Sequence, residues 1–341
     1  MIQRFCFCLA AMALAMPVWG QGHHHHHDTT PPDGGPASSA NSSDLWAFEY
    51  RLMSMGMKDL LSGKSDLLPT SVLGTNSAVR NSEGNPYMIT ATSMTMNMHM
   101  LMGTYTQSPA LTWMVMLNYI QSSMDMIMQM NRNGTTTQQE MTMEVSGIGD
   151  TEVMAMFNMD SAPGDTFTID LGLNLPTGDI EETDRNNGQR LPYGMRLGSG
   201  TFDLKPGATF IRARRHYQYG LQGSYTLRMG DNSRDYNMGD RLDISAFSQI
   251  DLKEFSLQTT LDFSDWDEIQ GRDTDLALNS TTNDPKNYGG TRLDLSVGVT
   301  LTPSKKFITG IKFATPIIQD LNGVQPKTST ILNFWLSYTW I

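Results

Sequence analysis

From residue 45 to its end, the chain alternates apolar and polar residues with a period of two. The C-terminal segment shows this pattern best. One of its faces carries Thr330, Leu332, Phe334, Leu336, Tyr338 and Trp340. The other face carries Ser329, Asn333, Ser337 and Thr339. Because successive side chains of a β-strand point to opposite faces, the pattern predicts strands with one apolar face. A soluble β-sandwich and a membrane β-barrel would both produce it.

The lengths of the connections separate these two folds. We predict about twelve strands, near 46–57, 92–105, 109–120, 148–159, 165–175, 201–212, 214–228, 240–251, 253–265, 289–302, 305–315 and 329–341. Links after the even-numbered strands are short, and links after the odd-numbered strands are long and polar, such as 58–91, 176–200 and 266–288. Up-and-down barrels of bacterial outer membranes have short periplasmic turns and long external loops. The sequence therefore predicts an all-β, antiparallel, up-and-down transmembrane barrel over 45–341, with both ends of the barrel chain in the periplasm.

Composition fits an exported barrel. Beyond the N-terminal segment no run approaches the roughly 18 apolar residues of a transmembrane helix, and 17% of the residues are charged. A net charge of −11 argues against nucleic acid as a partner. We expect the partners to be outer-membrane lipid and the barrel-assembly machinery, together with metal ions or small organic solutes.

The first 44 residues divide into two segments. Residues 1–20 have the pattern of a secretory signal peptide, with Arg4 before a short apolar stretch and small residues near Gly20. Both cysteines, Cys6 and Cys8, lie in this segment, so the predicted mature chain has no thiol for disulfides or thiolate metal sites. Residues 21–44 are rich in His, Pro, Gly and Ser and are predicted to form a disordered periplasmic tail.

Three segments resemble an outer-membrane family named for the putative meta-pathway of phenol degradation. They are Gly172-Leu173-Asn174-Leu175-Pro176-Thr177-Gly178-Asp179, the stretch from Leu191-Pro192-Tyr193 to Lys205-Pro206-Gly207, and Ser146-Gly147-Ile148-Gly149-Asp150. The resemblance implies a transporter-type outer-membrane barrel and covers most of the chain from Leu45. Such barrels often end in an aromatic residue, whereas this chain has Trp340 before a terminal Ile341.

Methionine is the compositional anomaly. The chain has 26 methionines, and twenty of them fall between Met53 and Met159, many as Met-x-Met. Two interpretations stay open. A thioether is a soft ligand that suits Cu(I), and methionine is also an adaptable apolar residue that could cover a lipid-facing surface.

The alternation assigns a face to most of these methionines. We expect the lumen-facing set, which shares its face with charged and polar residues, to hold the candidate metal ligands Met53, Met55, Met57, Met114, Met116, Met154 and Met156. The longest run, Met94 to Met102, alternates mainly with polar residues that suit a lumen, so we expect it to contact lipid. Met124 to Met130 fall in an external loop or strand extension and could serve either role.

The N-terminal tail adds a second candidate metal site, His23, His24, His25, His26 and His27. Neutral imidazoles bind copper, zinc and nickel. A natural metal-gathering tail and an engineered purification tag both explain the run.

No enzymatic motif emerges. Only His99 and His216 remain beyond the tail, and neither lies in a nucleophile motif, so we expect no catalytic site and no required cofactor. Our first hypothesis is an outer-membrane transport or channel protein that handles copper through a Met-lined lumen and the His tail. The alternatives are a channel for small organic or aromatic compounds and a non-transporting, metal-sequestering barrel.

Overall fold

The computed structural model describes residues 45–132, 135–159, 161–252, 255–304 and 306–340. The predicted signal peptide, the tail and its five histidines lie outside the described residues. Among the described residues, no helix is both long enough and apolar enough to cross a membrane.

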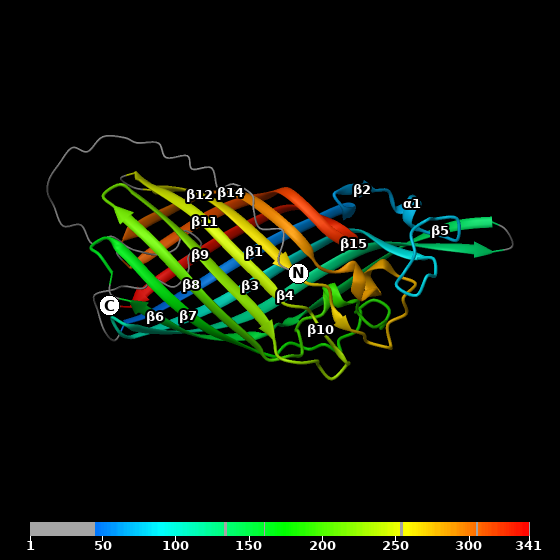
Figure 1. Cartoon of the computed structure of the whole chain (residues 1–341), viewed down its shortest axis with the longest axis horizontal. Coiled ribbons are helices and arrows are strands. Elements are labelled where there is room, and N and C mark those ends of the chain that lie inside the picture. Colours follow the sequence, from blue (N-terminus) through cyan, green and yellow to red (C-terminus); the bar gives the residue numbers. More distant parts are fainter. Residues whose placement is uncertain (1–44, 133–134, 160, 253–254, 305, 341) are drawn as a thin grey trace, which may run out of the picture.

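The described chain forms a closed antiparallel barrel (Figure 1). Eleven strands make the ring: β1 (Leu45–Gly63), β3 (Ile89–Ser108), β4 (Leu111–Arg132), β6 (Thr151–Met159), β7 (Asp165–Leu175), β8 (Asp203–Arg214), β9 (Tyr217–Arg228), β11 (Arg241–Leu252), β12 (Phe255–Trp266), β14 (Gly290–Ser304) and β15 (Phe307–Trp340). Each ring strand pairs with its neighbour along the chain, and β15 pairs with β1 to close the ring. The predicted fold class is confirmed.

The last strand accounts for the difference between eleven strands and the predicted twelve. β15 turns back on itself at Gly323, whose φ of 58° lies in the left-handed region that glycine tolerates. Its first half pairs with β14 and its second half pairs with β1. This single long element therefore covers the two strands predicted near 305–315 and 329–341.

The outer surface of the barrel is apolar. Along β12, Leu257 and Leu261 are exposed, whereas Gln258 and Thr260, which point the other way, are buried. Other ring strands likewise have apolar side chains on the outside, with Trp113, Val115 and other large apolar side chains exposed. A closed sheet leaves no unpaired edge, and an apolar outside matches a lipid surface.

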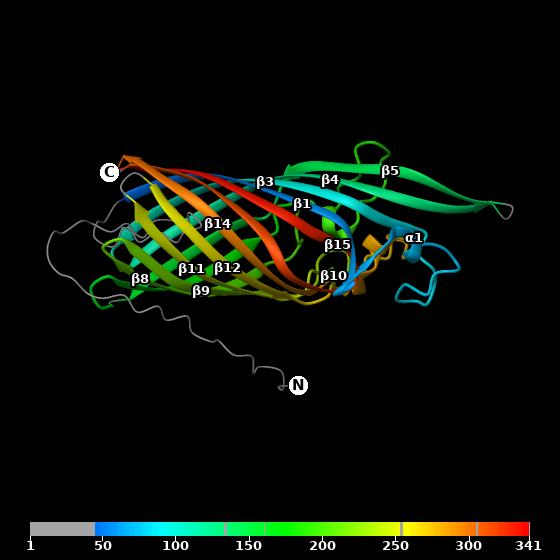
Figure 2. The ribbon, with the colours of Figure 1, turned by 90° about the horizontal axis from the view of Figure 1, so that it is seen from above.

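The two ends of the barrel differ (Figures 1 and 2). The turn end carries the short connections, and Trp46 pairs with Trp340 there. The loop end carries the long connections, with β2 (Ser65–Leu67), α1 (Pro69–Val72), η1 (Tyr193–Met195), β10 (Tyr236–Asn237), β13 (Gln270–Gly271), η2 (Thr281–Asn283) and η3 (Pro285–Asn287).

One element at the loop end was not predicted. β5 (Thr135–Ile148) pairs with the far half of β4, and the two extend beyond the ring as a projecting arm (Figure 2). Residues 124–130 therefore lie in a strand extension, one of the two placements that the sequence left open.

Candidate functional site

Methionines cover the inner face of β1, β3, β4 and β6. The alternation on β4 shows that its methionines point into the barrel, because Trp113 and Val115 are exposed on the outside while Met114, between them, is buried. We call this inner surface the methionine wall. It comprises Met53, Met55, Met57, Met94, Met96, Met98, Met100, Met102, Met114, Met116, Met124, Met154 and Met156.

Strand register makes the methionine wall continuous. Near the loop end, Met57, Met94, Met124 and Met143 are paired in turn across β1, β3, β4 and β5. Paired residues of neighbouring strands point to the same face, so these four thioethers form one row.

A second methionine group lies nearer the turn end. Met102, Met114 and Met156 form a buried cluster, against which Met116 and Met154 pack. We call these five residues the lower methionine cluster. Their strands are neighbours, with Met102 paired to Met116 and Met114 paired to Met154. The methionine wall therefore extends along much of the lumen.

The seven methionines predicted to face the lumen all belong to this wall. Their proposed role as metal ligands stays a prediction. The expectation that the run from Met94 to Met102 contacts lipid is wrong, since Leu101 is 58% exposed and Met102 is 7% exposed. The polar residues between these methionines lie on the outer face instead. His99 faces outward, where its Nδ1 lies 2.8 Å from the hydroxyl of Tyr50 and so has a polar partner despite the apolar surroundings.

The opposite side of the lumen, formed by β11, β12 and β14, is polar. The Ser264 hydroxyl donates to Asp243 at 2.7 Å, and the Ser245 hydroxyl donates to Asp262 at 2.5 Å. Arg292 forms an ion pair with Asp294 at 2.9 Å. The lumen thus has a methionine-rich side, which also carries Glu49, Arg51 and Glu152, and a charged, hydrogen-bonded side.

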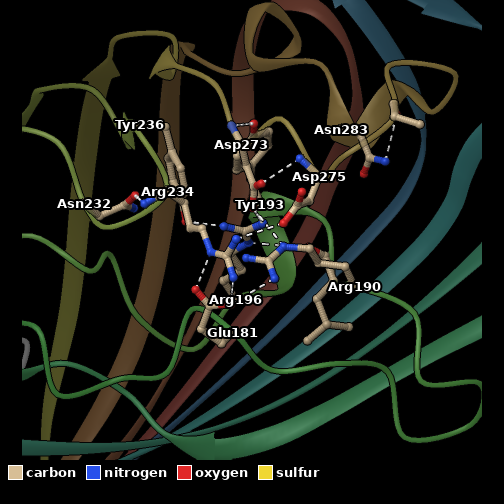
Figure 3. A network of polar contacts seen from close by, with 12 residues as sticks. Glu181, Arg190, Tyr193, Arg196, Asn232, Arg234, Tyr236, Asp273, Asp275 and Asn283 are labelled. Carbon is tan, nitrogen blue, oxygen red and sulfur yellow. Dashed lines mark hydrogen bonds and ion pairs between the residues drawn. The ribbon is translucent and has the colours of Figure 1, made fainter.

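Three loops pack together at the loop end, and we call residues 176–202, 229–240 and 267–289 the loop cap. Its centre is the ion pair between Arg196 and Asp273, with an N–O distance of 2.5 Å and side chains that are 1% and 2% exposed (Figure 3). The Arg196 guanidinium lies over the rings of Tyr193 and Tyr236, about 5 Å from each centroid. It also donates to the Tyr236 hydroxyl at 2.8 Å.

Further ion pairs join the same loops. Arg190 donates to Asp273 and to Glu181, each at 2.9 Å. Arg234 also binds Glu181, and it binds Asp275 at 2.8 Å. The cap is therefore held by buried and half-exposed charges as well as by apolar packing of Tyr193, Tyr236 and neighbouring side chains.

The charge network shifts the acidity of its carboxyl groups. Hydrogen bonds from Arg234 and Arg190 lower the pKa of Glu181 to about 2. Burial acts to raise the pKa of Asp273, but hydrogen bonds from Arg196, the Asp275 backbone and Arg190 outweigh it and hold that pKa below its ordinary value. Both groups are therefore anionic at neutral pH.

Sequence reasoning did not find the cap. Its central pair joins residues 77 positions apart in two loops that carry no periodicity. The available signal was the occurrence of arginine, aspartate and tyrosine within the long connections. Within the described residues, no three His, Cys, Asp or Glu side chains come together as a metal site.

Comparison with known proteins supports the fold. No family model matches the chain, and no curated protein matches it. Among solved structures, an outer membrane channel from Pseudomonas putida F1 is 12% identical, with 88% of this chain and 96% of that chain covered and a TM-score of 0.58. A mutant of the TodX monoaromatic hydrocarbon channel is 10% identical, with 89% and 91% covered and a TM-score of 0.46. At 12% identity, the likeness to the Pseudomonas putida channel shows a shared outer-membrane barrel fold.

Proposed function

We propose that this protein is an outer-membrane channel that passes small organic solutes with an apolar or aromatic body. The methionine wall is the observation that carries the proposal. Thioether side chains are apolar, unbranched and polarisable, and they make favourable contacts with aromatic rings. A solute moving along the wall would lose its contact with one methionine as it gained contact with the next. Its polar groups would face the hydrogen-bonded side of the lumen.

The barrel's architecture agrees with this proposal. The proposal puts the turn end in the periplasm and the loop end outside, because outer-membrane barrels usually have short periplasmic turns and long external loops. The Pseudomonas putida barrel of similar fold is named an outer membrane channel, which supports a channel function here. Membership of the phenol-degradation family is part of the same proposal.

Flux into liposomes tests the function. Wild-type protein is reconstituted, and uptake of a phenyl glucoside, an aromatic solute that crosses lipid slowly by itself, is compared with that of a variant in which the half-buried wall residues Met53, Met116 and Met154 are replaced by Gln. Loss of about 50 Å² of apolar contact would cost a solute about 1.3 kcal/mol, which is about a tenfold loss of flux. The matched control replaces Met130 and Met229 by Gln, because both are exposed and lie off the wall. Wild-type flux no greater than that of protein-free liposomes would refute the proposal.

The lower methionine cluster favours a second candidate, in which the lumen binds or passes Cu(I). Thioethers carry no proton to lose and are soft ligands. Copper would be cargo or ligand rather than a required cofactor, and His23 to His27 would raise its local concentration at the periplasmic end.

Competitive Cu(I) titration of the refolded protein tests this candidate. Replacing Met53, Met55, Met114, Met116, Met154 and Met156 by Leu should lower the Cu(I) stoichiometry, whereas Zn(II) binding by the His tail should stay the same. An unchanged Cu(I) stoichiometry would exclude these six methionines as ligands.

A further inference from the structure

The inward side chains form a distinct level of the lumen near the turn end. Strands of one barrel tilt by similar angles, so equal numbers of residues from the turn end reach a similar height. Phe247 lies five residues before the end of β11 at Leu252, and Trp335 lies five residues before the end of β15 at Trp340. We call the inward residues at this distance the lumen layer.

Most of the lumen layer is buried. Trp335 and Thr260 are each 1% exposed, and Phe247 is 6% exposed. The buried members come from β7, β8, β11, β12 and both halves of β15, and they are Asp170, Thr209, Phe247, Thr260, Lys312 and Trp335. A lumen filled with water at this level would leave the tips of these side chains exposed. Their burial therefore indicates that side chains fill most of the lumen here.

The strand number makes a filled level plausible in size. Barrels of about eight strands have an interior that side chains fill, whereas those of about 16–18 strands leave an aqueous channel. This ring lies between the two classes. Large inward residues can therefore close it where they meet, and smaller ones would leave it open.

The two aromatic rings of the layer are fixed by glycines on neighbouring strands. A Cβ on Gly310 would lie 2.1 Å from Cζ2 of Trp335, and a Cβ on Gly220 would lie 2.5 Å from Cζ of Phe247. Each ring thus occupies the space that a side chain on its glycine would fill. Close packing of this kind resists movement, so the two rings form a rigid side of the layer.

The rest of the layer is flexible. Its half-buried members are Met116, Met154 and Gln222, all of which have long unbranched side chains. Met116 and Met154 belong to the lower methionine cluster, and unbranched thioethers change conformation easily. The surface that stays accessible at this level therefore belongs to side chains that can move aside.

From these features we infer that the lumen layer is the size filter of the channel. Phe247 and Trp335 determine how wide the lumen can become, and a solute passes by displacing the side chains of Met116 and Met154. The layer decides which solutes pass. This inference rests on the proposed function for the kind of solute, but a filled lumen can also be measured as ion conductance.

A series of phenyl glycosides with one, two or three glucose units tests the filter in liposomes. Because pore diameter controls which solutes pass, wild-type protein should admit the monoglucoside at least about tenfold faster than the triglucoside. In the double variant Phe247→Ala, Trp335→Ala this ratio should fall below about threefold. Wild-type rates within about twofold of each other, or a ratio that the double variant leaves unchanged, would overturn the inference.

A matched control removes two rings from the outer face. Phe313 and Phe334 directly follow or precede layer residues of β15 and are 45% and 37% exposed. The double variant Phe313→Ala, Phe334→Ala removes the same number of aromatic side chains from the lipid-facing surface. It should therefore keep the wild-type size ratio.

Single-channel conductance in planar bilayers gives a second readout. Space left by a truncated core side chain is only partly refilled, so the alanine double variant should conduct at least about threefold more than wild type. Trp335→Phe retains a smaller ring and is measured as well, in case the double variant does not fold. It should conduct more than wild type, and a conductance unchanged in each folded layer variant would refute the filter.

The two proposals fail in different ways. Increased conductance of the layer variants, without flux of any phenyl glycoside through wild type or variants, would refute the channel function and leave the filled layer standing. Monoglucoside flux with a size ratio that the layer variants do not change would refute the filter and leave the channel standing.

Discussion

The central ion pair of the loop cap allows a quantitative prediction. Asp273→Asn keeps the size of the side chain and removes its charge. The Arg196 guanidinium then stays buried without a carboxylate partner, with neutral acceptors such as the Tyr236 hydroxyl and the Leu191 carbonyl around it. The change also weakens the bond from Arg190 Nε to the same carboxylate oxygen.

The size of the effect follows from burial. The two side chains are 1% and 2% exposed, and removing one partner of such a pair costs about 3–5 kcal/mol because a charge is left uncompensated. If that cost falls on the cap, the equilibrium between closed and open cap shifts by about 100-fold to 4,000-fold. The strands of the barrel do not depend on this pair, so their protection should stay as in the wild type.

Hydrogen exchange measured by mass spectrometry on refolded protein gives the readout. Peptides that contain 190–196, 232–236 and 273–276 should exchange at least about 100-fold faster in Asp273→Asn. The matched control is Asp66→Asn, since Asp66 forms a solvent-exposed pair with Lys327 at 2.9 Å, and such pairs are worth about 0–1 kcal/mol. Exchange in the cap peptides within threefold of the wild-type rate would refute the assignment of this pair as the main support of the cap.

Two further predictions concern the barrel and the pH response of the cap. A Cβ on Gly310 would lie 2.1 Å from Cζ2 of the buried Trp335 ring, so Gly310→Ala should destabilise the barrel by about 1–3 kcal/mol in thermal unfolding. Gly103→Ala, whose Cβ would approach no atom closer than 3.8 Å, should stay within about 0.5 kcal/mol of wild type, and equal melting of the two variants would contradict the packing argument. Because the pKa of Glu181 is lowered from 4.5 to about 2, its stabilisation of the cap is present above about pH 4.5 and is lost as the pH falls toward 2. Exchange protection of 181–196 should decline over that range and more weakly so in Glu181→Gln, and a pH-independent protection would contradict the role of the Arg234 ion pair.

The ring of the barrel was predictable because each strand carries its own evidence. A membrane strand must turn apolar residues toward lipid along its whole length, so Leu257 and Leu261 indicate their facing without knowledge of the neighbouring strands. The same rule failed on β3, where Asn97 and His99 occupy the outer face. A polar residue can do so when a neighbour satisfies it, as Tyr50 does for His99, and a single strand does not reveal its neighbour.

The arm and the cap could not be predicted from the sequence, for a different physical reason. Their structure depends on contacts between segments distant in the chain. Met126 and Met143 are buried under Leu191 and Met195 of the cap. They therefore behave as core residues in a part of the arm where the alternation between lipid-facing and lumen-facing residues no longer applies. The Arg196–Asp273 pair forms because two distant loops pack together. The sequence shows the residue types in those loops but has no periodic pattern there that would predict the contact.

In the proposed channel, we predict that the loop cap rather than the methionine wall limits the access of solutes. The cap packs Leu191 and Met195 onto Met124 and Met126 in one buried cluster. Methionine side chains can change rotamers at low cost because they are unbranched, whereas a buried ion pair resists partial opening. Solute passage in the proposed channel would therefore be limited by the rearrangement of cap residues over the wall. Weakening the cap by Asp273→Asn should then raise the flux of the phenyl glucoside, while the wall variant with three glutamines should lower it. A flux unchanged by Asp273→Asn would contradict control by the cap.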